Sequence, residues 1–213
     1  MTTPRRIGVI RVVTSTDLDF LGAHGRILEA ELGVTTRTAC IPDQPRGVHD
    51  DDSFALADRK VPLLAEELAP HVDAIVVSCA ADPGLAGARD RVAIPVLGAG
   101  ASAAGVALTL GERVGVLDLT TTTPASVTRV LGARLHGAIQ PDGVTETAHL
   151  LTPEGKRSSL DAGRRLVESG ADVLLLACTG MTTIGLAEPL RRALGVPVVD
   201  AVRTAGLLAA SPF

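Results

Sequence analysis

The stretch Asp172-Val-Leu-Leu-Leu-Ala-Cys178 decides the fold, because the earlier stretch Asp73-Ala-Ile-Val-Val-Ser-Cys79 repeats its pattern. In each, an aspartate is followed by a short apolar run and then by a cysteine. Such a run is typical of a strand that is buried on both faces of a parallel sheet. Residues at the carboxyl ends of these strands line the crevice where open α/β sheets bind ligands. We therefore expect both thiols to lie at strand ends and to face a site.

The segments around these two stretches repeat as well. A helix-like segment and a short proline-led strand follow each cysteine, at 94–97 in the first half and at 196–199 in the second. Similar strands open the two halves at 7–10 and 114–117. Two copies of one α/β unit predict two similar lobes that each present one cysteine to a shared cleft. The expected boundaries are residues 1–97 with 201–213 for the first lobe, which contains Cys79, and 98–200 for the second, which contains Cys178.

The composition is that of a soluble globular protein. Of the 213 residues, 46% are hydrophobic and 21% charged, so the chain can bury a sizeable core and is not disordered. The net charge of −4 and the absence of a basic run argue against nucleic acid or an anionic membrane as a partner. With 1% aromatic residues, a base-stacking or aromatic-cage site is not expected either. A small molecule is the expected partner.

The three cysteines indicate a reducing compartment, because an odd number does not suit a disulfide framework. No stretch reaches about 18 apolar residues, and neither a membrane span nor a signal peptide is predicted. We therefore expect a cytoplasmic protein whose thiols are available for catalysis. Cys40 differs from the other two, because it lies inside the weakly alternating second strand, 34–41, where a small buried apolar residue is expected.

Several further motifs have a structural interpretation. The run Asp50-Asp51-Asp52 suits a turn or a helix start better than a cation site. The segment 98–105 has its third glycine at the wrong spacing for a dinucleotide-binding loop, and the histidines lack metal-ligand spacing. No metal and no cofactor are therefore expected. The first helix is predicted to begin at the cap Thr14-Ser15-Thr16-Asp17 and to end at Gly33, and further helices are predicted over 53–68, 98–110, 152–169, 182–194 and 201–210.

Two facing thiols suit proton transfer at carbon. A free thiol is only about 3% thiolate at neutral pH, but a position just before a helix lowers its pKa. One thiolate can remove a proton next to a carbonyl, and a thiol on the opposite face can return one, which inverts the centre. The enolate would be stabilised by backbone amides after each cysteine and by the hydroxyls of 120–123. Simple helix capping explains those threonines equally well.

The cysteine segments resemble those of a known family. Cys79-Ala-Ala-Asp82-Pro83-Gly84-Leu85 resembles the Cys-x-x-Asp-Pro-Gly-Leu segment of hydantoin racemases, and Ala177-Cys178-Thr-Gly-Met181 resembles their Gly-Cys-Ala-Gly-Met segment. Val116-Leu117-Asp-Leu-Thr-Thr and Gly195-Val-Pro-Val-Val-Asp200 also match. The chain thus resembles the aspartate/glutamate/hydantoin racemase superfamily over most of its length, and the hydantoin racemases most closely.

The resemblance implies a cofactor-independent racemase of 5-substituted hydantoins or related amino-acid derivatives, with Cys79 and Cys178 as its two bases. It also implies a homo-oligomer and an α/β fold of two Rossmann-like lobes, related by a pseudo-two-fold axis, each with a four-stranded parallel sheet flanked by helices. Many hydantoin racemases have Asn-Pro-Asn-Thr where this chain has Arg11-Val-Val-Thr14, and Arg11 could pair with a carboxylate. The expected substrate contacts are Arg11, Thr14, Ala80, Ala81, Thr120, Thr121, Thr179 and Gly180.

Two other readings stay open. The first is another reaction of the same superfamily: aspartate- or glutamate-type racemisation, maleate-type isomerisation or decarboxylation of a malonate. A decarboxylase typically keeps one cysteine, so the presence of both counts against it. The second is a non-catalytic small-molecule binder whose cysteines are core residues. A single strand-end cysteine is more often structural, and the repeat at matched positions is what favours a catalytic pair.

Overall fold

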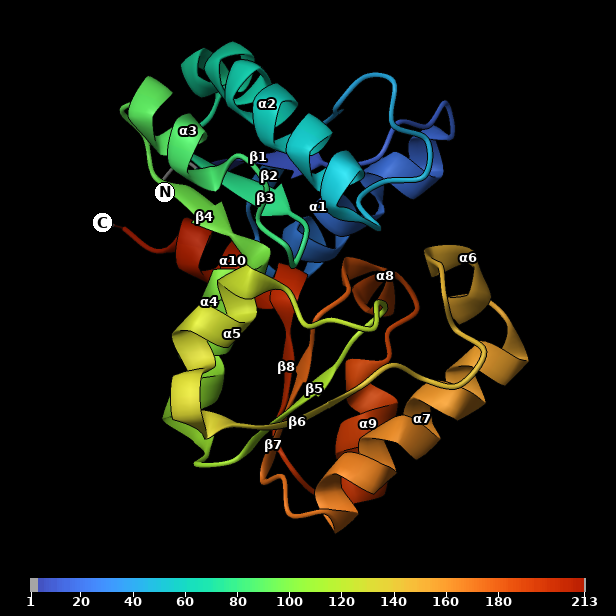
Figure 1. Cartoon of the computed structure of the whole chain (residues 1–213). Coiled ribbons are helices and arrows are strands. Elements are labelled where there is room, and N and C mark those ends of the chain that lie inside the picture. The colour runs from blue at the N-terminus through green and yellow to red at the C-terminus, as the bar shows by residue number, and fades with distance from the viewer. Residues whose placement is uncertain (1–3, 213) are drawn as a thin grey trace. The chain divides into compact units, whose positions relative to one another are not determined.

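The computed structural model describes residues 4–212, and these form two compact units. One unit comprises the chain up to Ala99 together with the segment from Ala205 onward, and the other comprises Gly100–Thr204. Each unit contains one sheet of four parallel strands, in the order β2-β1-β3-β4 in the first and β6-β5-β7-β8 in the second. The predicted α/β fold with two four-stranded parallel sheets is therefore confirmed (Figure 1).

In the first unit, helices cover both faces of the sheet. Helices α2 and α3 pack on one face and α1 lies against the other (Figure 1). The Asp17 carboxylate caps α1 by accepting the amides of its first turn, and Gly33 ends the helix in the left-handed conformation at φ +66°, as predicted. The elements of this unit are β1 (Arg6–Arg11), α1 (Leu18–Leu32), β2 (Thr35–Cys40), α2 (Asp51–Leu68), the 3₁₀ turn Ala69–His71, β3 (Ala74–Ser78), α3 (Leu85–Arg91) and β4 (Val96–Gly98).

The second unit repeats this arrangement. Helices α7 and α9 pack against one face of its sheet, and α4 and α5 lie on the other side (Figure 1). Its elements are α4 (Ala99–Leu110), β5 (Val114–Leu117), α5 (Ala125–Leu131), the 3₁₀ turn Gly132–Arg134, β6 (Leu135–Ile139), α6 (Thr147–Leu150), α7 (Pro153–Glu168), β7 (Val173–Leu176), α8 (Thr179–Thr183), α9 (Ala187–Leu194) and β8 (Val198–Asp200). Helix α10 (Ala201–Ala210) starts in this unit, and from Ala205 onward it belongs to the first.

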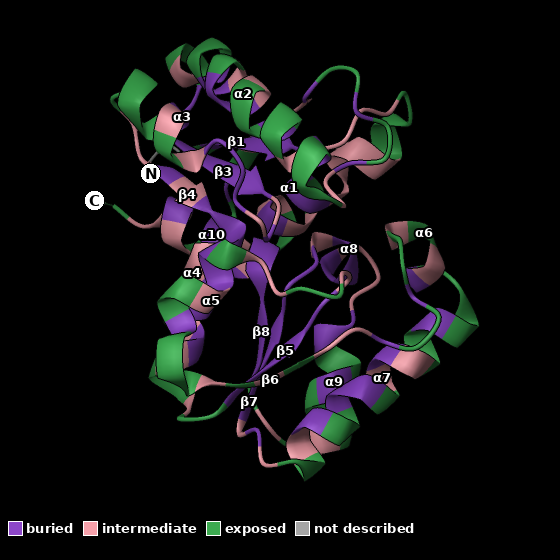
Figure 2. Ribbon diagram, viewed as in Figure 1, coloured by how far each residue is buried: buried purple, intermediate pink, exposed green. Residues whose placement is uncertain are grey.

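The core of each unit is formed by the apolar strands that the sequence singled out. Every residue of β3 and of β7 is buried, whereas the helices have both buried and exposed residues (Figure 2). In the first unit Ile75 belongs to the same buried cluster as Val61 of α2, and in the second Leu174 belongs to the same cluster as Leu190 of α9. Fully burying one such side chain contributes about 1.5–3 kcal/mol, so these contacts hold the strand ends in place.

The predicted single helix over 182–194 is wrong. The chain forms α8 and α9 instead, and Gly185 between them has φ +64°, a conformation that a right-handed helix does not contain. The four-residue helix α6 was not predicted at all. The other predicted helices form within two residues of the expected ends, and α10 has the predicted ends.

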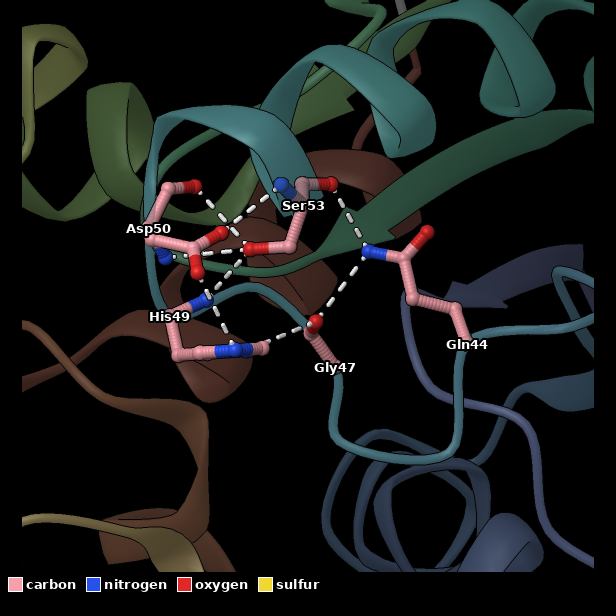
Figure 3. A network of polar contacts seen from close by, with 5 residues as sticks. All are labelled: Gln44, Gly47, His49, Asp50 and Ser53. Atoms are coloured by element: carbon pink, nitrogen blue, oxygen red, sulfur yellow. Dashed lines mark hydrogen bonds and ion pairs between the residues drawn. The ribbon is translucent and has the colours of Figure 1, made fainter.

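The loop between β2 and α2 is tied together by side chains (Figure 3). The Gln44 amide donates to the carbonyl oxygens of Gly47 and Ser53, at 3.1 and 2.8 Å. Asp50 caps α2: its carboxylate accepts the Ser53 amide at 2.8 Å, and the Ser53 hydroxyl accepts the Asp50 amide at 3.0 Å. These bonds confirm the interpretation of the acidic run at 50–52 as a helix start.

Among residues 4–212, no helix is both long enough and apolar enough to cross a membrane.

Candidate active site

Each unit places a cysteine just beyond the carboxyl end of the corresponding strand. In the first, β3 pairs with β1 so that Ser78 lies opposite Arg11, and Cys79 follows directly. In the second, β7 pairs with β5, the Ala177 amide donates to the Leu117 carbonyl at 2.8 Å, and Cys178 comes next. Both strands have paired neighbours on each side. The two cysteines therefore occupy equivalent positions in the two sheets.

Cys79 opens a tight turn rather than a helix. Its carbonyl accepts the amide of Asp82 at 3.1 Å, and Asp82 has the left-handed φ of +52°. Helix α3 begins only after Gly84, whose φ is +67° and whose amide donates to the Asp58 carboxylate at 2.7 Å. The thiol is half-buried, and Ala80 beside it is buried. The turn therefore fixes the backbone at Cys79, and the cysteine side chain is partly open to solvent.

The Asp82 side chain fills the space at the end of β4. A Cβ atom added to Gly98 would lie 2.4 Å from the carboxyl carbon of Asp82. Only glycine therefore fits at Gly98 while the Asp82 carboxyl stays in place. This close approach ties the turn after Cys79 to the neighbouring strand end.

Cys178 is buried, at 9% exposure, and packs in the hydrophobic cluster that includes Leu150 and Met181. Helix α8 starts directly after it, and Gly180 is required there because an added Cβ would lie 2.5 Å from the Thr147 methyl group. The Gly180 and Met181 amides lower the thiol pKa, as the sequence suggested, but burial outweighs them and raises it. The expectation of a lowered pKa is therefore wrong for Cys178, which is held as a thiol.

Asp118 is a site residue that the sequence analysis missed. It follows β5 directly, is 2% exposed, and its negative charge adds to the raised pKa of Cys178. Burial raises the pKa of Asp118 itself to about 6, although the Thr123 hydroxyl, which donates to Oδ2 at 2.5 Å, opposes the rise. Oδ1 has no hydrogen-bond partner among the described residues. The sequence could have indicated Asp118 as a site residue, because it is an acidic residue directly after a predicted apolar strand.

Arg11 and Thr14, both expected to bind substrate, have structural contacts at the end of β1. The Arg11 guanidinium is 4% exposed, donates to the carbonyls of Phe20 and Leu21 in α1, and lies 4.9 Å above the Phe20 ring. The Thr14 hydroxyl donates to the Ile41 carbonyl at 2.6 Å. These bonds fix both side chains beside the Cys79 strand, and contact with a substrate stays a prediction.

The other predicted contacts lie in the loops and turns that follow β3, β5 and β7. Thr120 and Thr121 are in the loop after β5, and the Thr120 hydroxyl donates to the Thr122 carbonyl at 2.9 Å while Thr121 is exposed. Thr179 and Gly180 begin α8 directly after Cys178, and Ala80 with Ala81 forms the turn after Cys79.

His24 is a second residue that sequence reasoning missed. It is fully buried in α1, and its Nδ1 lies 2.7 Å from the hydroxyl of Ser78, the residue before Cys79. No spacing pattern links positions 24 and 78, so only the fold brings them together. Among the described residues, no group of three or more His, Cys, Asp or Glu side chains could hold a metal ion.

A sequence model of the Asp/Glu/Hydantoin racemase family matches residues 22–208. A hydantoin racemase of Rhizobium meliloti is 33% identical over 147 residues, which are 64% of this chain and 58% of that protein, so the alignment spans little more than half of the relative. The structure of an allantoin racemase from Klebsiella pneumoniae covers 96% of this chain and 86% of its own, with 25% identity and a TM-score of 0.82.

An arylmalonate decarboxylase variant shares the fold, with a TM-score of 0.70, 19% identity, and coverage of 98% of this chain and 91% of its own. Two repeated α/β units, a cysteine at the same strand end in each, and a family match over most of the sequence agree. The chain belongs to the Asp/Glu/hydantoin racemase family.

Proposed function

We propose that this protein is a racemase that inverts the carbon next to a carbonyl in 5-substituted hydantoins or related amino-acid derivatives, with Cys79 and Cys178 as its two bases. The observation that carries the proposal is the matched placement of the two thiols, each just beyond the equivalent inner strand of its sheet. A pair of thiols at equivalent strand ends is what a two-base inversion needs, whereas two unrelated core cysteines would have no reason to share this position.

The reaction needs one thiolate and one thiol. The thiolate removes the Cα proton, and the electron pair of the C–H bond moves toward the carbonyl oxygen as an enolate. The thiol then delivers its own proton to the opposite face of that carbon. The first sulfur ends as a thiol and the second as a thiolate, so protons and charge balance, and the reverse reaction uses the same groups with their roles exchanged.

The surroundings of Cys178 support a starting role as the proton donor. Burial and the neighbouring Asp118 raise the pKa of this thiol, so it carries its proton at neutral pH. The thiolate of the pair would then be Cys79, which is half-buried and more open to solvent. Backbone amides after the cysteines and the Thr121 hydroxyl would donate to the enolate oxygen, and the Thr120 hydroxyl would do so after leaving the Thr122 carbonyl.

The mechanism also requires both sulfurs to reach opposite faces of one carbon. We propose that the lobes are residues 1–97 with 201–213 and 98–200, and that each supplies one of the two bases. Because thiols and hydrogen-bond donors supply the whole chemistry, activity should persist after exhaustive chelation and without added nucleotide or pyridoxal phosphate. Loss of activity with a chelator, restored by one metal, would contradict the proposal.

The names of the relatives guide the choice of substrates. One relative is named for hydantoin and another for allantoin, which is a hydantoin with a ureido group at C5. The decisive experiment incubates the protein in heavy water with single enantiomers of several 5-substituted hydantoins, allantoin, aspartate and glutamate. NMR would follow deuterium at Cα, and polarimetry would follow inversion. We expect enzyme-dependent exchange and inversion of at least one hydantoin. Exchange of free amino acids alone would instead favour an amino-acid racemase.

A further inference from the structure

One carboxylate oxygen beside Cys178 lacks a hydrogen-bond partner. Asp118 is 2% exposed, and its Oδ1 has no partner among the described residues. Buried polar atoms are almost always hydrogen-bonded, since leaving one unpaired costs about 1–3 kcal/mol, so an unpaired carboxylate oxygen calls for a functional explanation.

The fold holds this oxygen at the end of the strand that adjoins β7. Leu117 and Leu176 are register partners, so Asp118 and Ala177 leave their strands side by side and Cys178 follows. The Asp118 amide donates to the Ile139 carbonyl at 3.0 Å, and the Thr123 hydroxyl holds Oδ2 at 2.5 Å. Backbone and side chain are therefore both anchored, and Oδ1 is the one oxygen left to accept a bond.

We propose that Oδ1 of Asp118 accepts the N–H group that is bonded to the reacting carbon of the substrate, which makes Asp118 a specificity-determining residue. This inference rests on the proposed function. An ionised carboxylate is only an acceptor, so it suits an N–H donor and disfavours a substrate carboxylate on the same side. In a hydantoin, the N1–H group is bonded directly to C5, the carbon that Cys178 must reach.

The raised pKa of Asp118 agrees with this role. At a value of about 6, roughly nine-tenths of the side chain is ionised at neutral pH, so the acceptor form predominates. A desolvated carboxylate also gains more from a donor than an exposed one does, because no water competes for the bond.

The test combines a substrate change with a residue change. A 5-substituted hydantoin is compared with its N1-methyl and N3-methyl derivatives in the wild-type protein, Asp118→Leu and Asp118→Asn. For the unmethylated substrate, Asp118→Leu should lower kcat/KM by about 10- to 100-fold, the loss expected for one hydrogen bond to a charged group. N1-methylation of the substrate should lower kcat/KM by a similar factor in the wild-type protein and by much less in Asp118→Leu. We call this loss of kcat/KM the N1-methyl penalty.

Controls separate this role from a structural one. N3-methylation should have the same effect in the wild-type and variant proteins, and Asp161→Asn, an exposed acid on α7, should leave the N1-methyl penalty unchanged. The Asn variant keeps the side-chain shape and a neutral acceptor, so it should retain part of the penalty even if the Leu variant fails to fold.

The outcomes are distinguishable. If the wild-type protein shows no exchange with any hydantoin, the proposed function fails. If it racemises hydantoins but the N1-methyl penalty is the same in all variants, Asp118 does not contact this N–H and the inference is wrong.

Discussion

The two units place a cysteine at the same strand end but arrange the neighbouring acid in opposite ways. In the first, the acid is Asp82, three residues after Cys79, and its carboxyl lies against Gly98 at the end of β4. In the second, the acid is Asp200 at the end of β8, and Thr182 from α8 donates to it at 2.8 Å. The acid therefore lies in the segment after the cysteine in the first unit and at the end of the last strand in the second, and its glycine or threonine partner takes the other of these two places.

This difference shows which properties of the thiols the repeat determines and which it leaves free. Strand register fixes where each sulfur lies, because the cysteine follows the equivalent strand in both units. Protonation depends on the neighbours instead. Cys178 is buried beside Asp118 and has a raised pKa, whereas Cys79 is half-buried and follows a serine that is hydrogen-bonded to His24. A sequence repeat can thus place two thiols at equivalent positions but in different surroundings.

Exchanging either cysteine for serine tests whether both repeats are needed. Racemisation should fall by roughly 10²- to 10⁴-fold in Cys79→Ser and in Cys178→Ser, because a serine hydroxyl is too weak an acid to be ionised near neutral pH. Each variant keeps one thiol and should still exchange the Cα proton of one enantiomer with deuterium. The two variants should favour opposite enantiomers. Polarimetry measures the rate. If both variants racemise the substrate at a near-native rate, the two cysteines are not the acid and base of the reaction.

Exchanging Asp118 for asparagine tests the special surroundings of Cys178. The folded-state pKa of Asp118 is raised from 3.8 to about 6, so the folded protein binds this proton more tightly than the unfolded chain does. The resulting stability is fully present below pH 3.8 and is lost as the pH rises through 6, a change of about 3 kcal/mol.

Asp118→Asn cannot ionise and should avoid that loss. Urea unfolding should find the variant more stable than the wild-type protein at pH 8, with the advantage shrinking toward pH 4. Asp161→Asn, at an exposed position on α7, is the matched control. A pH-independent difference for Asp118→Asn would show that this carboxyl is not buried in the folded protein.

Gly98→Ala tests the close contact between the Asp82 carboxyl and the end of β4 in the first unit. The new methyl group would lie 2.4 Å from the Asp82 carboxyl carbon, so the carboxyl must shift, and the unfolding free energy should drop by about 1–3 kcal/mol. Gly105 is the control, because an added Cβ meets nothing within 4 Å in the middle of α4 and should stabilise the helix by about 0.5–1 kcal/mol. Equal effects at both positions would contradict the close Asp82 contact.

The smallest effect is expected for Cys40→Ser. Cys40 ends the edge strand β2 and is separated from the Cys79 strand by Arg11 of β1. The proposed mechanism gives the Cys40 thiol no part in proton transfer, so the racemisation rate should equal that of the wild-type protein. Loss of activity in this variant would indicate that Cys40 of β2, and not Cys79, is the reacting thiol.

The sequence predicted the strands well because their signal is local. Apolar runs, proline-led strands and the caps at Asp17 and Gly33 depend on neighbouring residues, and each appears in the structure. The split of the predicted 182–194 helix depends on the backbone angle of Gly185, which a tolerated glycine in a helical pattern does not reveal.

The chemical character of the site was less predictable. The lowered pKa expected for both thiols considered only the amides that follow each cysteine. For Cys178, burial and Asp118 outweigh those amides, and part of the burial comes from Leu150, about 30 residues away, while Asp118 is 60 residues away in the chain. The contact of His24 with Ser78 joins residues that are 54 positions apart. Long-range contacts of this kind leave no spacing signature in one sequence.

The loop that Gln44, Asp50 and Ser53 tie together has a consequence for local opening. It has no helix or strand of its own between β2 and α2, yet the amides of His49 and Asp50 donate to the Ser53 hydroxyl in the first turn of α2, and the Ser53 amide donates back to the Asp50 carboxylate. Amides bonded in this way exchange with solvent only when the bonds break together. In a hydrogen-exchange experiment this loop should therefore behave as part of the folded unit that includes α2. Ser53→Ala removes the hydroxyl acceptor and should release the His49 and Asp50 amides together, whereas the amide of residue 53 should stay bonded to the Asp50 carboxylate.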